Sequence, residues 1–184
     1  MRARGNLGPD TLTRVSFHVH TPGLAVGRVF SSIAVPPNEI NMPAHLRDAE
    51  IERIARGLID RTLPKSDWTH AAHFAAALWL LRERGLSACL QEMPGLIRAY
   101  NEATGVPNTD TGGYHATITV ASLRAGNAWL AASAHLPLSA ALGEFLGSAY
   151  GRSDWLLTYW SQASLFSVAA RRAWVDPDLR PLPF

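Results

Sequence analysis

The chain contains very little cysteine: Cys89 is the single one among 184 residues. One cysteine excludes an intrachain disulfide framework and a cysteine-rich zinc site. Cys89 lies in an apolar stretch with helical character. This position favours a small buried hydrophobic side chain over a reactive thiol.

Long hydrophobic runs are also lacking. No uncharged apolar run reaches the roughly 20 residues that a membrane helix needs. The apolar stretch 67–81 is short and contains two histidines. The basic start Met1-Arg2-Ala3-Arg4 is not followed by an apolar segment, so the sequence predicts no signal peptide. We therefore expect a cytoplasmic protein without a membrane partner.

Charge of either sign is modest, with charged residues at 17% and a formal net charge of +2. The arginines are dispersed, and no run of basic residues with interleaved aromatic rings occurs. Nucleic acid is therefore not an expected partner. Hydrophobic residues make up 47% of the chain. A chain of this length and composition can bury a core without disulfide or metal support.

Two regions differ in their pattern. Residues 1–43 hold the turn formers Pro22-Gly23 and Pro36-Pro37-Asn38 with β-type runs between them. They predict a short non-helical or β-hairpin N-terminal arm. Because isolated hairpins are marginally stable, this arm must pack on the rest of the chain or on a partner, and a homodimer formed through it is possible. Residues 44–184 form the predicted helical domain.

Proline, glycine and capping residues mark the expected helix boundaries in the helical domain. Ser66 or Asp67 caps one predicted helix, Gly85 ends it, and Pro94 is expected to kink or split the next one. A proline-rich tail after the last helix is expected to run extended. The fold prediction is an all-α, compact multi-helix bundle. The helices are predicted at residues 44–63, 66–84, 86–104, 113–132, 138–149, 154–159 and 161–172.

Three histidines carry the clearest chemical signal. His70 and His73 lie about 60° apart on one helix face, which Phe74 marks as pointing toward the core. His115 follows a glycine pair and shares its helix face with Thr119. If the two helices are neighbours, the three imidazoles could hold a divalent transition metal, zinc or iron, with an open position for water.

Two alternatives to a metal site stay open. The histidines lie just after helix-start signals, where backbone N–H groups and the helix dipole attract anions. The same residues could therefore bind a carboxylate or phosphate without a metal. They could also be satisfied core or capping histidines, since H-x-x-H lacks the glutamate that makes the zinc-protease motif specific.

Other side chains could assist such a site. Tyr114 and Thr119 are candidate catalytic hydrogen-bond donors, and Glu102 is the most plausible nearby carboxylate. Asp110 is either a turn-capping residue or the partner that orients His115. Trp68, beside His70, is the tryptophan best placed to line the site.

The chain resembles an uncharacterised family of small bacterial helical proteins. Their motifs are an aromatic-Thr-His-x-x-His helix start, a Gly-Tyr-His-Glu-Thr-(Ile/Leu)-Thr helix start and a Trp-Val-x-Pro-Asp-Leu tail, matched here by residues 68–73, 113–119 and 174–179. The resemblance implies that these positions form one unit, and it implies no activity. One departure is Ala116, which replaces the glutamate expected after the third histidine and weakens the case for catalysis more than that for binding.

The leading hypothesis is a metal-binding helical protein, an enzyme that acts on a small polar or anionic molecule through His70, His73 and His115. The alternative is a non-catalytic module that binds a small molecule, an anion or another protein.

Overall fold

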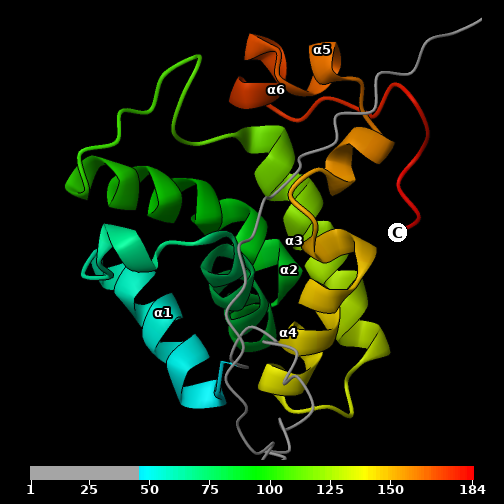
Figure 1. Cartoon of the computed structure of the whole chain (residues 1–184). Coiled ribbons are helices and arrows are strands. Elements are labelled where there is room, and N and C mark those ends of the chain that lie inside the picture. The colour runs from blue at the N-terminus through cyan, green and yellow to red at the C-terminus, as the bar shows by residue number, and fades with distance from the viewer. Residues whose placement is uncertain (1–45) are drawn as a thin grey trace, which may run out of the picture. The chain divides into compact units, whose positions relative to one another are not determined.

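The computed structural model describes residues 46–184, and every regular element in this range is a helix (Figure 1). The four longer ones are α1 (Asp48–Asp60), α2 (His70–Ala103), α3 (Ala116–Ala132) and α4 (Leu138–Gly147). The all-α prediction is thus confirmed for the described residues. The predicted arm at residues 1–43 lies outside the described residues. A homodimer formed through this arm stays a prediction.

Short helical turns fill most of the C-terminal third. They are η2 (Ala149–Gly151), η3 (Trp155–Thr158), α5 (Gln162–Leu165) and α6 (Val168–Arg172). The single helix predicted at residues 161–172 is wrong, because Ser161 and Ser167 each cap a new start. Each serine hydroxyl accepts a hydrogen bond from the backbone N–H three residues later. The short helix predicted at residues 154–159 is present as the 3-10 helix η3.

Helix α2 starts and breaks at positions that local chemistry explains. Thr69 is its N-cap, accepting a 3.3 Å hydrogen bond from Ala72 N, whereas Ser66 and Asp67 belong to a preceding 3-10 turn, η1 (Lys65–Asp67). Within α2, Gly85 alone leaves the helical range, with φ 76° and ψ 167°. The expected break at Gly85 is therefore confirmed, and Pro94 does not split the helix.

Helix α2 is the central element of the bundle. It packs against α1 on one side and α3 on the other, and α4 contacts all three (Figure 1). The core between these helices is aliphatic and aromatic. Its most deeply buried large side chains include Ile51, Leu58, Leu78, Leu123, Phe145 and Trp160. This packing places the N-terminal halves of α2 and α3, with their histidines, on a fixed frame.

The proline-rich tail contains no helix, as expected, and hydrogen bonds anchor its start. The Thr117 hydroxyl, fully buried on α3, donates to Ala173 O at 2.9 Å and accepts from Val175 N at 3.1 Å. The Trp160 indole N–H donates to Val175 O at 3.1 Å. The start of the tail is thereby tied to both α3 and the C-terminal turns.

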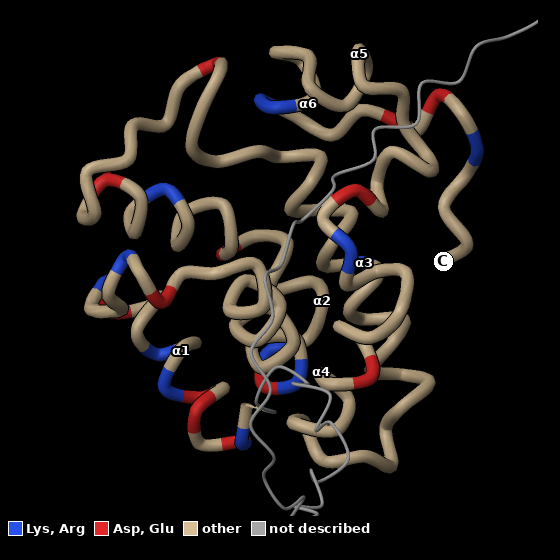
Figure 2. The backbone as a smooth tube through the Cα atoms, in the orientation of Figure 1, with Lys and Arg blue, Asp and Glu red and all other residues tan. Residues whose placement is uncertain are grey.

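Surface charges alternate rather than gather. Basic and acidic positions are interspersed along α1 (Figure 2), and the Arg56 guanidinium pairs with the Glu52 carboxylate one turn away. No helix within residues 46–184 has the length and apolar character needed to cross a bilayer.

Candidate functional site

His70 and His73 occupy the first turn of α2, and their rings have different surroundings. The His70 Nε2 atom lies 2.9 Å from Gly151 O, so this nitrogen carries the proton and donates to the carbonyl. The His70 ring also meets the Phe74 ring edge-on at 5.1 Å. This hydrogen bond joins α2 to the turn η2 and leaves Nδ1 of His70 as the acceptor nitrogen.

His73 is the more unusual of the pair. Its ring centroid lies 4.2 Å from that of Trp68, which in turn lies 5.2 Å from that of Tyr100. Part of the His73 surface reaches solvent, but the protein atoms packed around the ring lower its pKa to about 4, and His70 adds to the effect. His73 is therefore neutral at physiological pH. Among the described residues, nothing forms a hydrogen bond with its ring.

His115 is the N-cap of α3 instead of a residue inside its first turn. Its Nδ1 atom accepts from Ile118 N at 3.4 Å, and its Nε2 atom donates to Leu165 O at 2.9 Å. Burial and the Arg171 charge both lower the pKa of this imidazole, which keeps it neutral. Both ring nitrogens are thus occupied by protein groups.

The three rings are not assembled as ligands to one ion. Within residues 46–184, no group of three His, Cys, Asp or Glu side chains lies close enough to hold a metal. His115 does not fit a metal site as it stands, because a ligand needs a nitrogen lone pair. The zinc or iron prediction therefore depends on the pair His70 and His73, and it stays a prediction.

Tyr114 and Thr119, the candidate donors, lie together beside His115. The Arg98 guanidinium lies 4.4 Å above the centre of the Tyr114 ring, a cation–π contact. Burial raises the pKa of the Tyr114 phenol, whereas the Arg98 charge and the neighbouring Thr119 hydroxyl act in the opposite direction. The Thr119 hydroxyl donates to His115 O at 2.8 Å. Because burial is the largest of these effects, the Tyr114 phenol stays protonated at neutral pH.

Asn108 holds the loop that leads into α3. Its side-chain oxygen accepts from Asn101 Nδ2 at 2.9 Å and from Tyr114 N at 3.1 Å. Its amide nitrogen donates to the Glu102 carboxylate at 3.3 Å. Glu102, expected as a base or ligand, is thereby engaged in loop structure.

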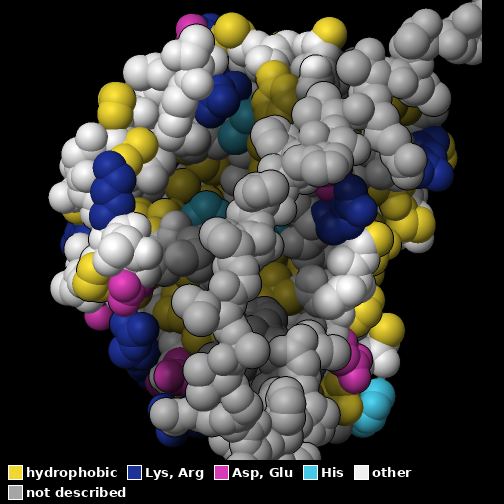
Figure 3. Space-filling model, in the orientation of Figure 1, with side chains coloured by type: hydrophobic (Ala, Val, Ile, Leu, Met, Phe, Trp, Pro, Cys, Tyr) yellow, Lys and Arg dark blue, Asp and Glu magenta, His cyan; other side chains and the backbone are white. Residues whose placement is uncertain are grey.

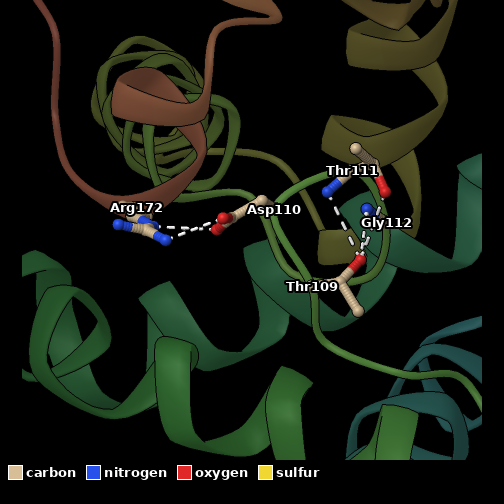
Figure 4. A network of polar contacts seen from close by, with 5 residues as sticks. All are labelled: Thr109, Asp110, Thr111, Gly112 and Arg172. Carbon is tan, nitrogen blue, oxygen red and sulfur yellow. Dashed lines mark hydrogen bonds and ion pairs between the residues drawn. The ribbon is translucent and has the colours of Figure 1, made fainter.

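Asp110 has a partner that the sequence did not indicate. The expectation that it caps the loop or orients His115 is wrong, because its carboxylate accepts two hydrogen bonds from Arg172, at 2.8 and 2.7 Å (Figure 4). The capping role belongs to Thr109, whose hydroxyl accepts from Thr111 N and Gly112 N. The Asp110–Arg172 pair ties the loop to α6.

Arg171 is the residue that sequence reasoning missed. Its Nη1 atom donates to Gly113 O at 3.3 Å and to Tyr114 O at 3.2 Å. Its Nε atom is buried and has no hydrogen-bond partner among the described residues. No local signal marks Arg171, since its partners lie 57 and 58 residues away in the chain.

One face of the molecule is hollowed. Figure 3 shows histidine side chains recessed within this face, with hydrophobic side chains around them and basic side chains nearby. A concave, mostly apolar surface with a few polar groups is typical of small-molecule sites.

Comparisons with family models, curated proteins and solved structures find no match to this chain. The resemblance to the uncharacterised helical family therefore stays a prediction.

The histidine environments predict a pH dependence of stability. Unfolded His73 takes up a proton near pH 6.5, whereas the folded protein protonates it only near pH 4. Between these values the unfolded state binds more protons, so the free energy of unfolding should fall as the pH is lowered. Burial lowers the pKa of His115 as well, which adds to the same trend. Urea denaturation between about pH 7 and about pH 4 measures the slope.

The matched variants are His73→Gln and His135→Gln, since His135 is exposed. His73→Gln should flatten the decline, and His135→Gln should leave it unchanged. An equal slope in the wild type and His73→Gln would contradict the assignment of His73 as a neutral imidazole.

Proposed function

We propose that this protein binds a small carboxylate-bearing molecule at the face formed by Arg171, Tyr114 and Arg98. The observation that carries the proposal is the buried Arg171 Nε atom without a hydrogen-bond partner among the described residues. A buried donor left unpaired costs about 1–3 kcal/mol, and more when it is charged. An anion that accepts from this nitrogen would remove that cost.

The guanidinium geometry supports a carboxylate as the anion. Arg171 uses Nη1 for the two loop carbonyls, which leaves the edge formed by Nε and Nη2. Arg152 and Arg172 both use this same edge to hold an aspartate with two hydrogen bonds. A bidentate arginine–carboxylate pair combines charge with directional hydrogen bonding.

The neighbouring groups are suited to an anion. The imidazole of His115 is neutral, and both of its nitrogens already form hydrogen bonds, so it does not compete with Arg171 for the anion. The Arg98 guanidinium adds a second positive charge beside Tyr114. Within the described residues, neither Arg98 nor Arg171 forms an ion pair with a carboxylate.

The test is an NMR titration that follows the arginine Nε–H signals while acetate, succinate or inorganic phosphate is added. We expect succinate or acetate to shift the Arg171 signal. Arg171→Lys keeps the charge but lacks the two adjacent N–H donors of a guanidinium. This variant should weaken binding of the carboxylate about tenfold. Arg152→Gln is the control, because it removes an exposed arginine that holds Asp154 through the same edge, away from the loop before α3. If no anion moves the Arg171 signal, or if Arg171→Lys binds as tightly, the proposal is wrong.

The second candidate function is metal binding by the α2 pair. His70 and His73 are one turn apart and close enough to influence each other electrostatically, and neutral His73 has no described hydrogen-bond partner. Neutral imidazole is a good ligand for zinc and iron. Two protein ligands would leave positions for water or for an anionic molecule.

Metal analysis of protein made without a histidine tag tests this candidate. We expect about one equivalent of zinc per chain, lost in His73→Ala because a two-ligand site cannot spare one. His135→Ala, which changes an exposed histidine, should retain the metal. Sub-stoichiometric zinc, or binding that survives His73→Ala, would contradict it.

A further inference from the structure

A second recess lies in the C-terminal third, apart from the residues discussed above. It has a volume of about 510 Å³ and is built from the segment that contains η2 and η3. Its aromatic lining residues are Tyr150, Trp155 and Tyr159. This volume falls within the range of about 300–1,000 Å³ that is typical of small-molecule sites.

The aromatic rings of this recess stand at steep angles to one another. The Tyr150 and Trp155 rings are 5.3 Å apart with an interplanar angle of 82°, and those of Trp155 and Tyr159 are 6.0 Å apart at 76°. The Tyr150 ring also stacks on buried Phe145 at 5.8 Å, which anchors this wall in the core. Such walls offer both ring faces and ring edges to a flat aromatic guest.

The polar groups at the recess favour an anion over a cation. The Arg152 guanidinium is neutralised by Asp154, which it holds with two hydrogen bonds of 2.9 Å. The Arg180 guanidinium lies 5.2 Å above the Tyr159 ring and donates through Nε to Thr158 O at 2.9 Å. Among residues 46–184, no carboxylate pairs with Arg180. Its charge is therefore available to a ligand at the rim.

We propose that this recess binds a planar aromatic carboxylic acid, with its ring against Tyr150, Trp155 and Tyr159 and its carboxylate on Arg180. Arg171 does not line this recess. Ligand binding in the recess is therefore tested separately from the function proposed above.

The experiment is a calorimetric titration of the full chain with 2-naphthoate. Its neutral counterpart is 2-naphthalenemethanol, which has the same rings without the charge. We expect 2-naphthoate to bind more tightly than the alcohol by about tenfold, as suits a charge-assisted contact. Arg180→Gln should abolish this difference and leave the affinity for the alcohol unchanged. Tyr159→Leu should weaken both compounds, because both stack on the ring.

A control variant locates the binding. Arg124 makes the same type of contact as Arg180, with its guanidinium 4.4 Å above the Trp174 ring, but Trp174 does not line the recess, whereas the Tyr159 ring beneath Arg180 does. Arg124→Gln should leave 2-naphthoate binding unchanged. Arg180 is exposed, so Arg180→Gln is expected to fold normally, which a circular dichroism melt verifies. Absence of 2-naphthoate binding, equal affinity for the alcohol, or binding that is insensitive to Arg180→Gln would each overturn the proposal.

Discussion

Replacement of Gly113 by alanine is expected to lower the free energy of unfolding by about 3 kcal/mol. The residue has φ 76°, in the left-handed region, which costs a side-chain-bearing residue about 1–2 kcal/mol. A Cβ atom there would also lie 2.6 Å from Pro107 O and 2.8 Å from the Asn108 side-chain oxygen. That oxygen holds Tyr114 N in place, so the substitution disturbs Tyr114 at the candidate anion site.

The matched control is the preceding glycine. A Cβ atom on Gly112 would meet only Thr109 Oγ1, at 3.6 Å, an ordinary contact. Gly112→Ala should therefore change the free energy of unfolding by less than about 0.5 kcal/mol. Urea denaturation of both variants gives the comparison. Equal losses would show that the loop geometry around Asn108 is not as described.

Thr117→Val is expected to destabilise the protein by about 2 kcal/mol, because it removes both hydrogen bonds between the buried hydroxyl and the backbone of the tail. Valine has nearly the same shape as threonine, so the change removes the hydroxyl and little else. The hydroxyl is the acceptor for Val175 N and the donor to Ala173 O. We also expect faster hydrogen exchange of the tail amides, since the tail loses its attachment to α3.

Two variants separate the hydroxyl from the methyl group. Thr117→Ser keeps the hydroxyl and should retain most of the tail protection. Thr158→Val removes a hydroxyl at an exposed position, and its effect should stay below about 0.5 kcal/mol. A Thr117→Val variant as stable as the wild type would contradict the role of this side chain.

The helical frame was predictable because its signals are local. Hydrophobic spacing, the glycine at position 85 and the serine, threonine and proline residues act on their own neighbours. The errors also have local causes. Ser161 and Ser167 were read as parts of one helix, although each caps a separate one. Pro94 was expected to kink or split its helix, and the split is absent, since helical geometry continues on both sides of this residue.

The sequence alone determined that this chain is helical and that His70 and His73 share the first turn of one helix. Tertiary structure decided what each ring can do. Both ring nitrogens of His115 form hydrogen bonds within the protein. The acceptor for Nε2 is the backbone oxygen of Leu165, which lies 50 residues away in the chain. Arg171 reaches the loop before α3 from α6 by the same kind of distant contact. Spacing along one helix follows from backbone geometry, whereas hydrogen-bond partners and burial depend on which distant segments pack together.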